Sequence, residues 1–184
     1  MKPLRRLARR CLVVVDRAYR RWHHLRPVGP VMYIGRTRYR GPERQFADGA
    51  ILRSGDFIGT MHFDNQRLAA LANDSPSATG MHFARLVFPS LRRLGDLLQT
   101  DEAFRDVAVV QGVGWFHHGT ELGVVNEPLP PGPRRRFLAR YLRLLVWAFA
   151  PNEGSAHSVQ PEPTVTWLTR HVLLTRFARE SRHG

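Results

Sequence analysis

The sequence predicts a single α+β domain in which three or four helices pack on a mostly antiparallel sheet of four to six strands. Three observations support this fold class. The chain has 184 residues, 43% of them hydrophobic, which suffices for one core but not for two comfortable domains. Its only cysteine is Cys11, so burial rather than disulfide bonds must stabilise the fold. Apolar residues alternate with a period of two in some segments and recur at helical spacing in others.

The first predicted element is a basic amphipathic helix within residues 1–26, and the α+β domain is expected over residues 27–184. Apolar residues recur at helical spacing, and arginines occupy most of the remaining positions. Residues 1–44 carry 13 basic and 2 acidic side chains, a net charge of +11, whereas the rest of the chain carries +2. An anionic neighbour is therefore expected at this end. The candidate contacts are seven arginines: Arg5, Arg6, Arg9, Arg10, Arg17, Arg20 and Arg21.

Three roles for this helix stay open. In the first, an apolar stripe dips into an anionic membrane surface while the arginines meet lipid phosphates. In the second, the same stripe packs on the sheet and the arginines are solvated. In the third, aromatic side chains between arginines stack on nucleic-acid bases. The residues concerned are Leu7, Cys11, Val14, Ala18 and Trp22 for the stripe, and Trp22, Tyr33 and Tyr39 for stacking.

No apolar run approaches the roughly 20 residues that a membrane-spanning helix needs. The expected location is the cytoplasm, with the inner face of the membrane as a candidate surface.

The other elements follow from alternation, helical spacing and the positions of glycine and proline. Alternation predicts strands, prolines predict breaks, and Asp48-Gly49 predicts a tight hairpin. In chain order, the predictions are a strand over 31–40, the hairpin over 45–52, a strand over 57–64, short and long helices over 66–72 and 80–100, the latter broken or kinked near Pro89, strands over 107–115 and 122–125, a helix over 134–150, a loop over 152–163, and a helix or a strand followed by a helix over 164–179.

Residues 55–65, Gly-Asp-Phe-Ile-Gly-Thr-Met-His-Phe-Asp-Asn, hold the densest group of chemically active side chains. On a strand, His62 and Asp64 point to the same face, where they suit a general base with its orienting carboxylate, or two metal ligands. The neighbouring candidates for ligand binding are Gly55, Asp56, Gly59 and Asn65. The structural alternatives are a turn cap at Asp56, a helix cap at Asn65 and a core hydrogen bond at His62.

A second cluster follows the strand predicted over 107–115. His117, His118 and Glu121 would form an acid–base or divalent-metal site with His62 and Asp64 if the two segments meet. Their spacing matches no established zinc motif, so we expect no tightly bound metal. The sequence identifies no cofactor.

Several segments together resemble the YkoP-like domain family, and the likeness spans most of the chain. These segments are Asp16-Arg17-Ala18-Tyr19-Arg20, Leu25-Arg26-Pro27-Val28-Gly29-Pro30, Tyr39-Arg40-Gly41-Pro42, residues 52–65 and Trp167-Leu168-Thr169-Arg170. Members of that family occur alone or fused behind bacterial polysaccharide-deacetylase domains. The resemblance implies an association with cell-envelope polysaccharide or lipid-linked glycan metabolism. The metal-binding Asp/His motifs of the deacetylase have no counterpart here, so that activity does not transfer.

The expected function is a peripheral accessory or ligand-binding domain of envelope glycan metabolism. The expected binding partners are an anionic membrane surface and, beside it, a glycan, a lipid-linked substrate or a polysaccharide deacetylase. The first alternative is a hydrolase or transferase that uses His62 and Asp64 on a sugar or lipid-linked substrate. The second is a nucleic-acid-binding protein that uses the arginine-rich N-terminal segment.

Overall fold

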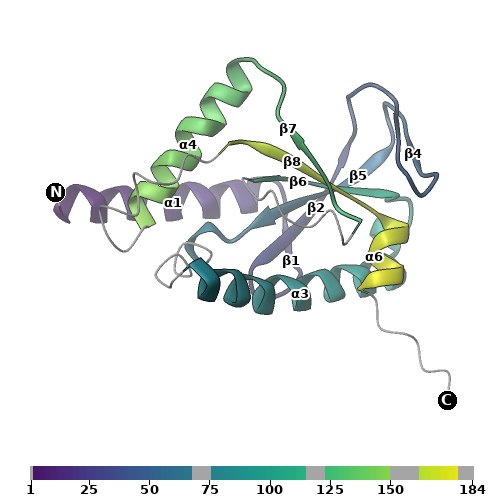
Figure 1. Ribbon diagram of the computed structural model, residues 1–184, viewed down its shortest axis with the longest axis horizontal. Helices are drawn as coiled ribbons and strands as arrows, with labels where there is room; N and C mark the ends of the chain where they lie inside the picture. The colour runs from purple at the N-terminus through teal and green to yellow at the C-terminus, as the bar shows by residue number, and fades with distance from the viewer. Residues whose placement is uncertain (1, 68–75, 115–122, 150–161, 178–184) are drawn as a thin grey trace.

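A six-stranded sheet lies at the centre of the molecule, with helices on both of its faces (Figure 1). The computed structural model describes residues 2–67, 76–114, 123–149 and 162–177. The strand order is β1-β2-β5-β6-β8-β7, and every neighbouring pair is antiparallel except β5 and β6. The strands are β1 (Arg26–Pro27), β2 (Met32–Arg38), β5 (Phe57–Phe63), β6 (Val109–Gly114), β7 (Val125–Pro128) and β8 (Thr164–Thr169). The predicted α+β class with a mostly antiparallel sheet is therefore confirmed.

One face of the sheet is covered by α3 (Pro76–Thr100) and α6 (Arg170–Arg176), which run along the bottom and the right of Figure 1. Buried Leu94 and Leu98 of α3 and Leu173 of α6 pack there with side chains of the strands. A single-turn helix, η1 (Glu102–Phe104), connects α3 to β6. Because β5 and β6 are parallel, the chain must cross from one end of the sheet to the other between them, and α3 and η1 lie in this connection.

The other face is covered by two groups of elements. A small hairpin of β3 (Arg44–Gln45) and β4 (Ile51–Leu52) packs Phe46 and Leu52 against Trp167 of the sheet. The helices α1 (Lys2–Trp22) and α4 (Pro133–Phe149) cover the rest, and buried Leu12 of α1 joins buried side chains of α4 in a cluster of its own.

The alternation in β5 is the one that the sequence predicts. Phe57, Met61 and Phe63 lie with the core beneath α3, whereas Ile58 and His62 point to the face that carries α1 and α4. This register brings His62 beside Tyr33, its Cα partner on β2. The face that holds His62 is thus fixed by the apolar residues that alternate with it.

Two predicted elements differ from the structure. The helix α3 begins at Pro76, since proline suits the first helical turn, and it continues past Pro89 without a break. The hydroxyl of Ser90, the next residue, donates to the backbone oxygen of Leu86 at 2.9 Å. The strand β7 begins where the predicted one ends, after a turn in which Gly123 has a φ of 76°. Over 164–177 the chain forms the strand β8 and then the helix α6, in agreement with the second of the two predicted alternatives.

Candidate functional site

The inward side of α1 is anchored to α4 and to the sheet. Leu12 and Asp16 are 6% and 5% exposed. The guanidinium of Arg5 donates to the backbone oxygen of Trp147 at 2.8 Å, and that of Arg9 donates to the backbone oxygen of Ala148. These carbonyls belong to the last turn of α4, where backbone oxygens lack helical partners and attract cations. Two arginines thus serve as caps for another helix.

The outward side of α1 carries an apolar stripe that nothing in the described parts of the chain covers. At about 100° per residue, its members fall on one face of the helix. Trp22 is 83% exposed and Val14 62%, unusually high values for large apolar side chains. The exposed members are Leu4, Leu7, Cys11, Val14, Val15, Ala18 and Trp22, which we call the outer stripe. The alternative in which this stripe packs on the sheet is therefore wrong, and Cys11 is exposed rather than packed.

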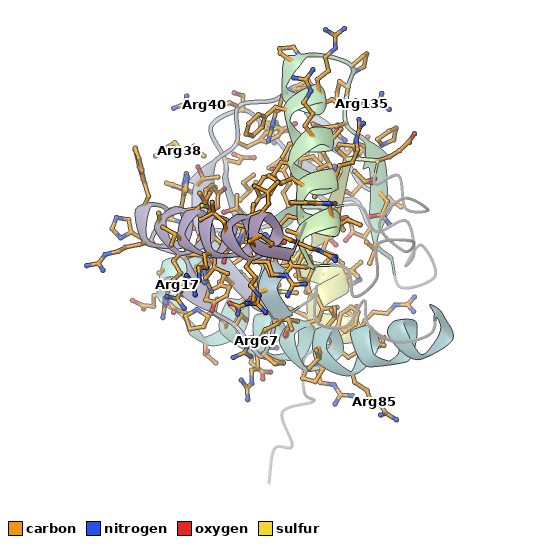
Figure 2. All side chains as sticks on the ribbon, turned by 90° about the vertical axis from the view of Figure 1, so that its left-hand side faces the viewer. Arg17, Arg38, Arg40, Arg67, Arg85 and Arg135 are labelled. Carbon is orange, nitrogen blue, oxygen red and sulfur yellow. The ribbon has the colours of Figure 1, made fainter. Side chains whose placement is uncertain are left out.

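Exposed arginines flank the outer stripe. Of the seven predicted anion contacts, Arg5, Arg9 and Arg20 turn inward and bind other parts of the fold. The remaining four are exposed and form no ion pair with any residue that the structure describes: Arg6, Arg10, Arg17 and Arg21. Figure 2 looks onto this side of the molecule, where α1 crosses α4 and Arg17 is labelled.

Beneath the inward side, the buried carboxylate of Asp16 is the centre of a polar network. Its Oδ2 is 3.0 Å from Nη2 of Arg20, and its Oδ1 is 2.7 Å from Nε2 of His62 and 3.4 Å from Nδ2 of Asn65. The guanidinium of Arg20 continues to Asp64 at 3.5 Å and lies over the ring of Tyr33, 4.4 Å from its centroid. The network joins α1 to β5, so it fixes how α1 is rotated on the sheet.

The structure brings His62 and Asp64 to the same cluster but gives them different partners. His62 bonds to Asp16, not to Asp64. Asp64 accepts a hydrogen bond from the backbone N–H of Arg67 at 3.1 Å, so it is Asp64, not the predicted Asn65, that caps the helix beginning at residue 65. The carboxylate that contacts His62 is therefore that of Asp16, where the sequence predicted Asp64. The signal in the sequence was Asp16 itself, the only acidic residue of an arginine-rich helix.

Tyr141 of α4 completes the network. Burial raises the pKa of Tyr141, the nearby charge of Asp16 adds to this, and a hydrogen bond with Asn65 acts in the opposite direction. The phenol thus keeps its proton at alkaline pH values at which an unfolded chain loses it, since tyrosine normally titrates near pH 10.

This shift predicts an alkaline loss of stability. Above about pH 10 the unfolded chain binds fewer protons than the folded one, so the free energy of unfolding falls as the pH rises. We expect Tyr141→Phe to flatten this decline, as measured by urea unfolding between pH 9 and 11. The slopes are compared rather than the absolute values, because the variant also loses the bond to Asn65. If the free energy of unfolding falls equally steeply with pH in both proteins, the raised pKa of Tyr141 is not the cause of the decline.

The other predicted ligand-binding residues of the central motif lie elsewhere. Gly55 has a φ of 98° and Asp56 accepts the backbone N–H of Arg53 at 2.7 Å, so both belong to the turn before β5. His62 is six positions after Asp56, which corresponds to about 20 Å along a strand. Gly59 is buried, and a side chain there would meet Ile34 and Val110 at 3.1 Å. These three residues shape the turn and the core, and they do not converge on His62.

The second predicted cluster, His117, His118 and Glu121, lies outside the described residues. The parallel pairing of β6 with β5 brings the end of β6 at Gly114 to the same edge of the sheet as His62. Among the residues that the structure describes, no three His, Cys, Asp or Glu side chains are grouped as metal ligands. Within the same residues, no helix combines the length and the apolar character needed to cross a membrane.

The aromatic residues considered for base stacking do not share a surface. Tyr39 is 7% exposed, donates its hydroxyl hydrogen bond to the backbone oxygen of Pro42 and packs edge-on against Trp167. Tyr33 lies beneath Arg20. Only Trp22 presents its ring to solvent, so the predicted stacking platform is absent from the described structure.

A family model described as the YkoP domain matches residues 5–177. The match includes α1 from Arg5 onward, the whole sheet and α6. It therefore includes the network centred on Asp16 and the outer stripe except Leu4. No curated protein and no solved structure matches the chain.

Proposed function

This chain belongs to the YkoP domain family, and from the outer stripe of α1 we propose that it is a peripheral accessory domain that binds an anionic membrane surface. The observation that carries the proposal is the pairing of an exposed apolar stripe with four exposed arginines on one helix. We further propose the inner face of the bacterial membrane as its location and envelope glycan metabolism as its context. The resemblance to domains found beside polysaccharide deacetylases supports that context.

The chemistry of α1 fits a lipid interface. Each arginine close to an anionic surface contributes on the order of 1 kcal/mol, so Arg6, Arg10, Arg17 and Arg21 together contribute about 4 kcal/mol before screening by salt. The apolar side chains between them add the free energy of leaving water, and a tryptophan prefers the depth of the lipid headgroups. Neither a purely solvated helix nor a nucleic-acid site needs the apolar half of this surface.

The rigid attachment of α1 supports the same function. The bonds of Arg5 and Arg9 to α4, and of Asp16 to His62, hold the helix with the outer stripe directed away from the domain. A helix held in this rotation presents its apolar face without refolding. The entropy that a free amphipathic peptide loses on adsorption is therefore already lost in the folded protein.

Vesicle co-sedimentation tests the proposal. At low ionic strength we expect the protein to pellet with vesicles of phosphatidylglycerol and phosphatidylcholine but not with phosphatidylcholine alone. Raising the salt concentration should weaken the binding, because the Debye length shortens from about 10 Å at 0.1 M to about 3 Å at 1 M. Equal binding to neutral and anionic vesicles, or binding to neither, would reject the proposal. A dimer detected by sedimentation in the absence of lipid would assign the outer stripe to a second copy of the chain instead.

A general-base site is the second candidate function, supported by the bond between Asp16 and His62. A carboxylate that holds one imidazole nitrogen orients the ring and leaves the other nitrogen to accept a proton. Here the held nitrogen is Nε2, and the side chain of His62 is 22% exposed. The chemistry would be hydrolysis or transfer on a sugar or lipid-linked substrate.

Turnover of fluorogenic glycosides and phosphate esters tests this second function. Turnover by the wild-type protein that His62→Gln abolishes, without lowering the melting temperature, would establish the site. No turnover, or a loss that accompanies unfolding, would assign His62 to the structural network alone. In that case removing the imidazole costs about 1–3 kcal/mol, because a partner of Asp16 is lost.

A further inference from the structure

The N-terminal end of α4 contains a second basic surface, separate from α1. A hollow of about 410 Å³ is lined there by Gly132, Pro133, Arg136, Phe137 and Arg140. Its size is within the roughly 300–1,000 Å³ typical of sites for small molecules. The hollow lies towards the end of α4 where Figure 2 labels Arg135, whereas α1 contacts the opposite end of that helix through Trp147 and Ala148.

The charge in this hollow is not neutralised by its surroundings. Residues 129–149 contain five arginines and no acidic residue. Both Arg136 and Arg140 are exposed, and no carboxylate in the described parts of the chain is within ion-pair distance of either. Elsewhere in the fold arginines do find such partners, as Arg44 does with Glu127 at 2.8 Å and Arg53 with Glu43 at 3.1 Å.

The spacing of the two arginines suits one doubly charged group. Residues four apart on a helix have Cβ atoms about 5–6 Å apart, so two guanidinium groups converge on a ligand between them. A phosphate monoester carries about −1.5 to −2 charges at pH 7 and offers oxygens that guanidinium groups bind in a bidentate manner. Phe137 is 69% exposed in the wall of the hollow, where its ring supplies an apolar contact for the carbon skeleton of the same ligand.

We propose that the hollow formed by Arg136, Phe137 and Arg140 binds a phosphate monoester carried on a sugar or glycerol unit. The group comes either from a soluble sugar phosphate or from the headgroup of a lipid such as phosphatidic acid. The two sources share the chemistry that the hollow recognises. The site is independent of the outer stripe, because the two surfaces use different helices and have no residue in common.

Isothermal titration with glucose 1-phosphate tests the soluble source. We expect saturable binding that the double variant Arg136→Gln/Arg140→Gln weakens at least tenfold, because each charged hydrogen bond is worth about a factor of ten or more. The matched control is Arg134→Gln/Arg143→Gln, which removes the same charge from the same helix outside the hollow. This control should bind as the wild type does. Equal weakening by both double variants would show that the phosphate is attracted by the overall charge of the helix and not by a specific site. That result would overturn the proposal.

Vesicles containing phosphatidic acid test the lipid source. If the hollow binds a lipid headgroup, Arg136→Gln/Arg140→Gln should weaken binding to these vesicles at least tenfold, and the control pair should not. In that case glucose 1-phosphate gives no saturable heat. Absence of binding in both the soluble and the lipid arm overturns the proposal. If the wild type binds glucose 1-phosphate, a Val14→Asp/Trp22→Asp variant, altered only in the outer stripe, should bind it equally well. That result separates failure of this site from failure of membrane docking by α1.

Discussion

Asp16→Ala is expected to lower the free energy of unfolding by about 3 kcal/mol, the effect of removing one partner from a buried ion pair. The variant leaves Arg20, His62 and Asn65 without the carboxylate that they share. For a chain of this length, the loss corresponds to a melting temperature lower by roughly 6–12 °C. Urea unfolding and thermal melts at pH 7 measure it.

Glu43→Ala is the matched control, since Glu43 also pairs with an arginine but both side chains of that pair are 62% exposed. Exposed pairs contribute little, so its free energy of unfolding should stay within about 0.5 kcal/mol of the wild-type value. Similar small losses for both variants would show that water replaces the carboxylate of Asp16. The network would then not be what holds α1 in place.

Val14→Asp/Trp22→Asp is expected to weaken binding to anionic vesicles by about a hundredfold. The two side chains are 62% and 83% exposed, so nearly all the apolar surface that they would bury in a membrane is lost. Fully burying a large apolar side chain is worth about 1.5–3 kcal/mol, so even the lower value for both side chains corresponds to a factor of about a hundred in the dissociation constant. The melting temperature should not change, because these residues support no packing in the described fold.

Two controls make this result specific. Ile51→Asp changes an apolar residue of similar type that is 39% exposed on the hairpin, far from α1 in Figure 1, and it should leave vesicle binding unaltered. The lone cysteine adds a direct readout, because Cys11 lies in the outer stripe and accepts a single environment-sensitive fluorophore. We expect its emission to shift to the blue with anionic vesicles. An unchanged spectrum on vesicles that do bind the protein would place the contact on another surface.

The regular elements were predictable from the sequence because local patterns determine them. The alternation in residues 57–63 predicts both the strand and the face on which His62 lies, since each apolar neighbour that enters the core turns the imidazole to the other side. The helix over 133–149 follows in the same way from its apolar face and the prolines before it. The predicted break near Pro89 is wrong, because a proline inside a helix need not end it.

The site was less predictable because its partners are distant in the sequence. His62 and Asp64 are close on one strand and suggested a pair, but the carboxylate that His62 meets is 46 residues away, on α1. Likewise, helical periodicity in α1 shows that an apolar stripe exists, but not which side of the helix faces the fold. The inward side is chosen instead by Asp16, Arg20 and Leu12, a mainly polar set that hydrophobicity alone does not select.

The contacts that hold α1 against α4 cannot form until α4 has been synthesised. Arg5 and Arg9 bond to residues of α4 that are 142 and 139 positions later in the chain, and Leu12 packs against the same helix. The ribosome adds about 5–20 residues per second, so α1 waits several seconds before its partner exists. During that interval the inward arginines of α1 have no partner on α4, and they add to the charge beside the outer stripe. If α1 binds an anionic membrane as proposed, the nascent chain would be able to do so before the domain that holds α1 has folded.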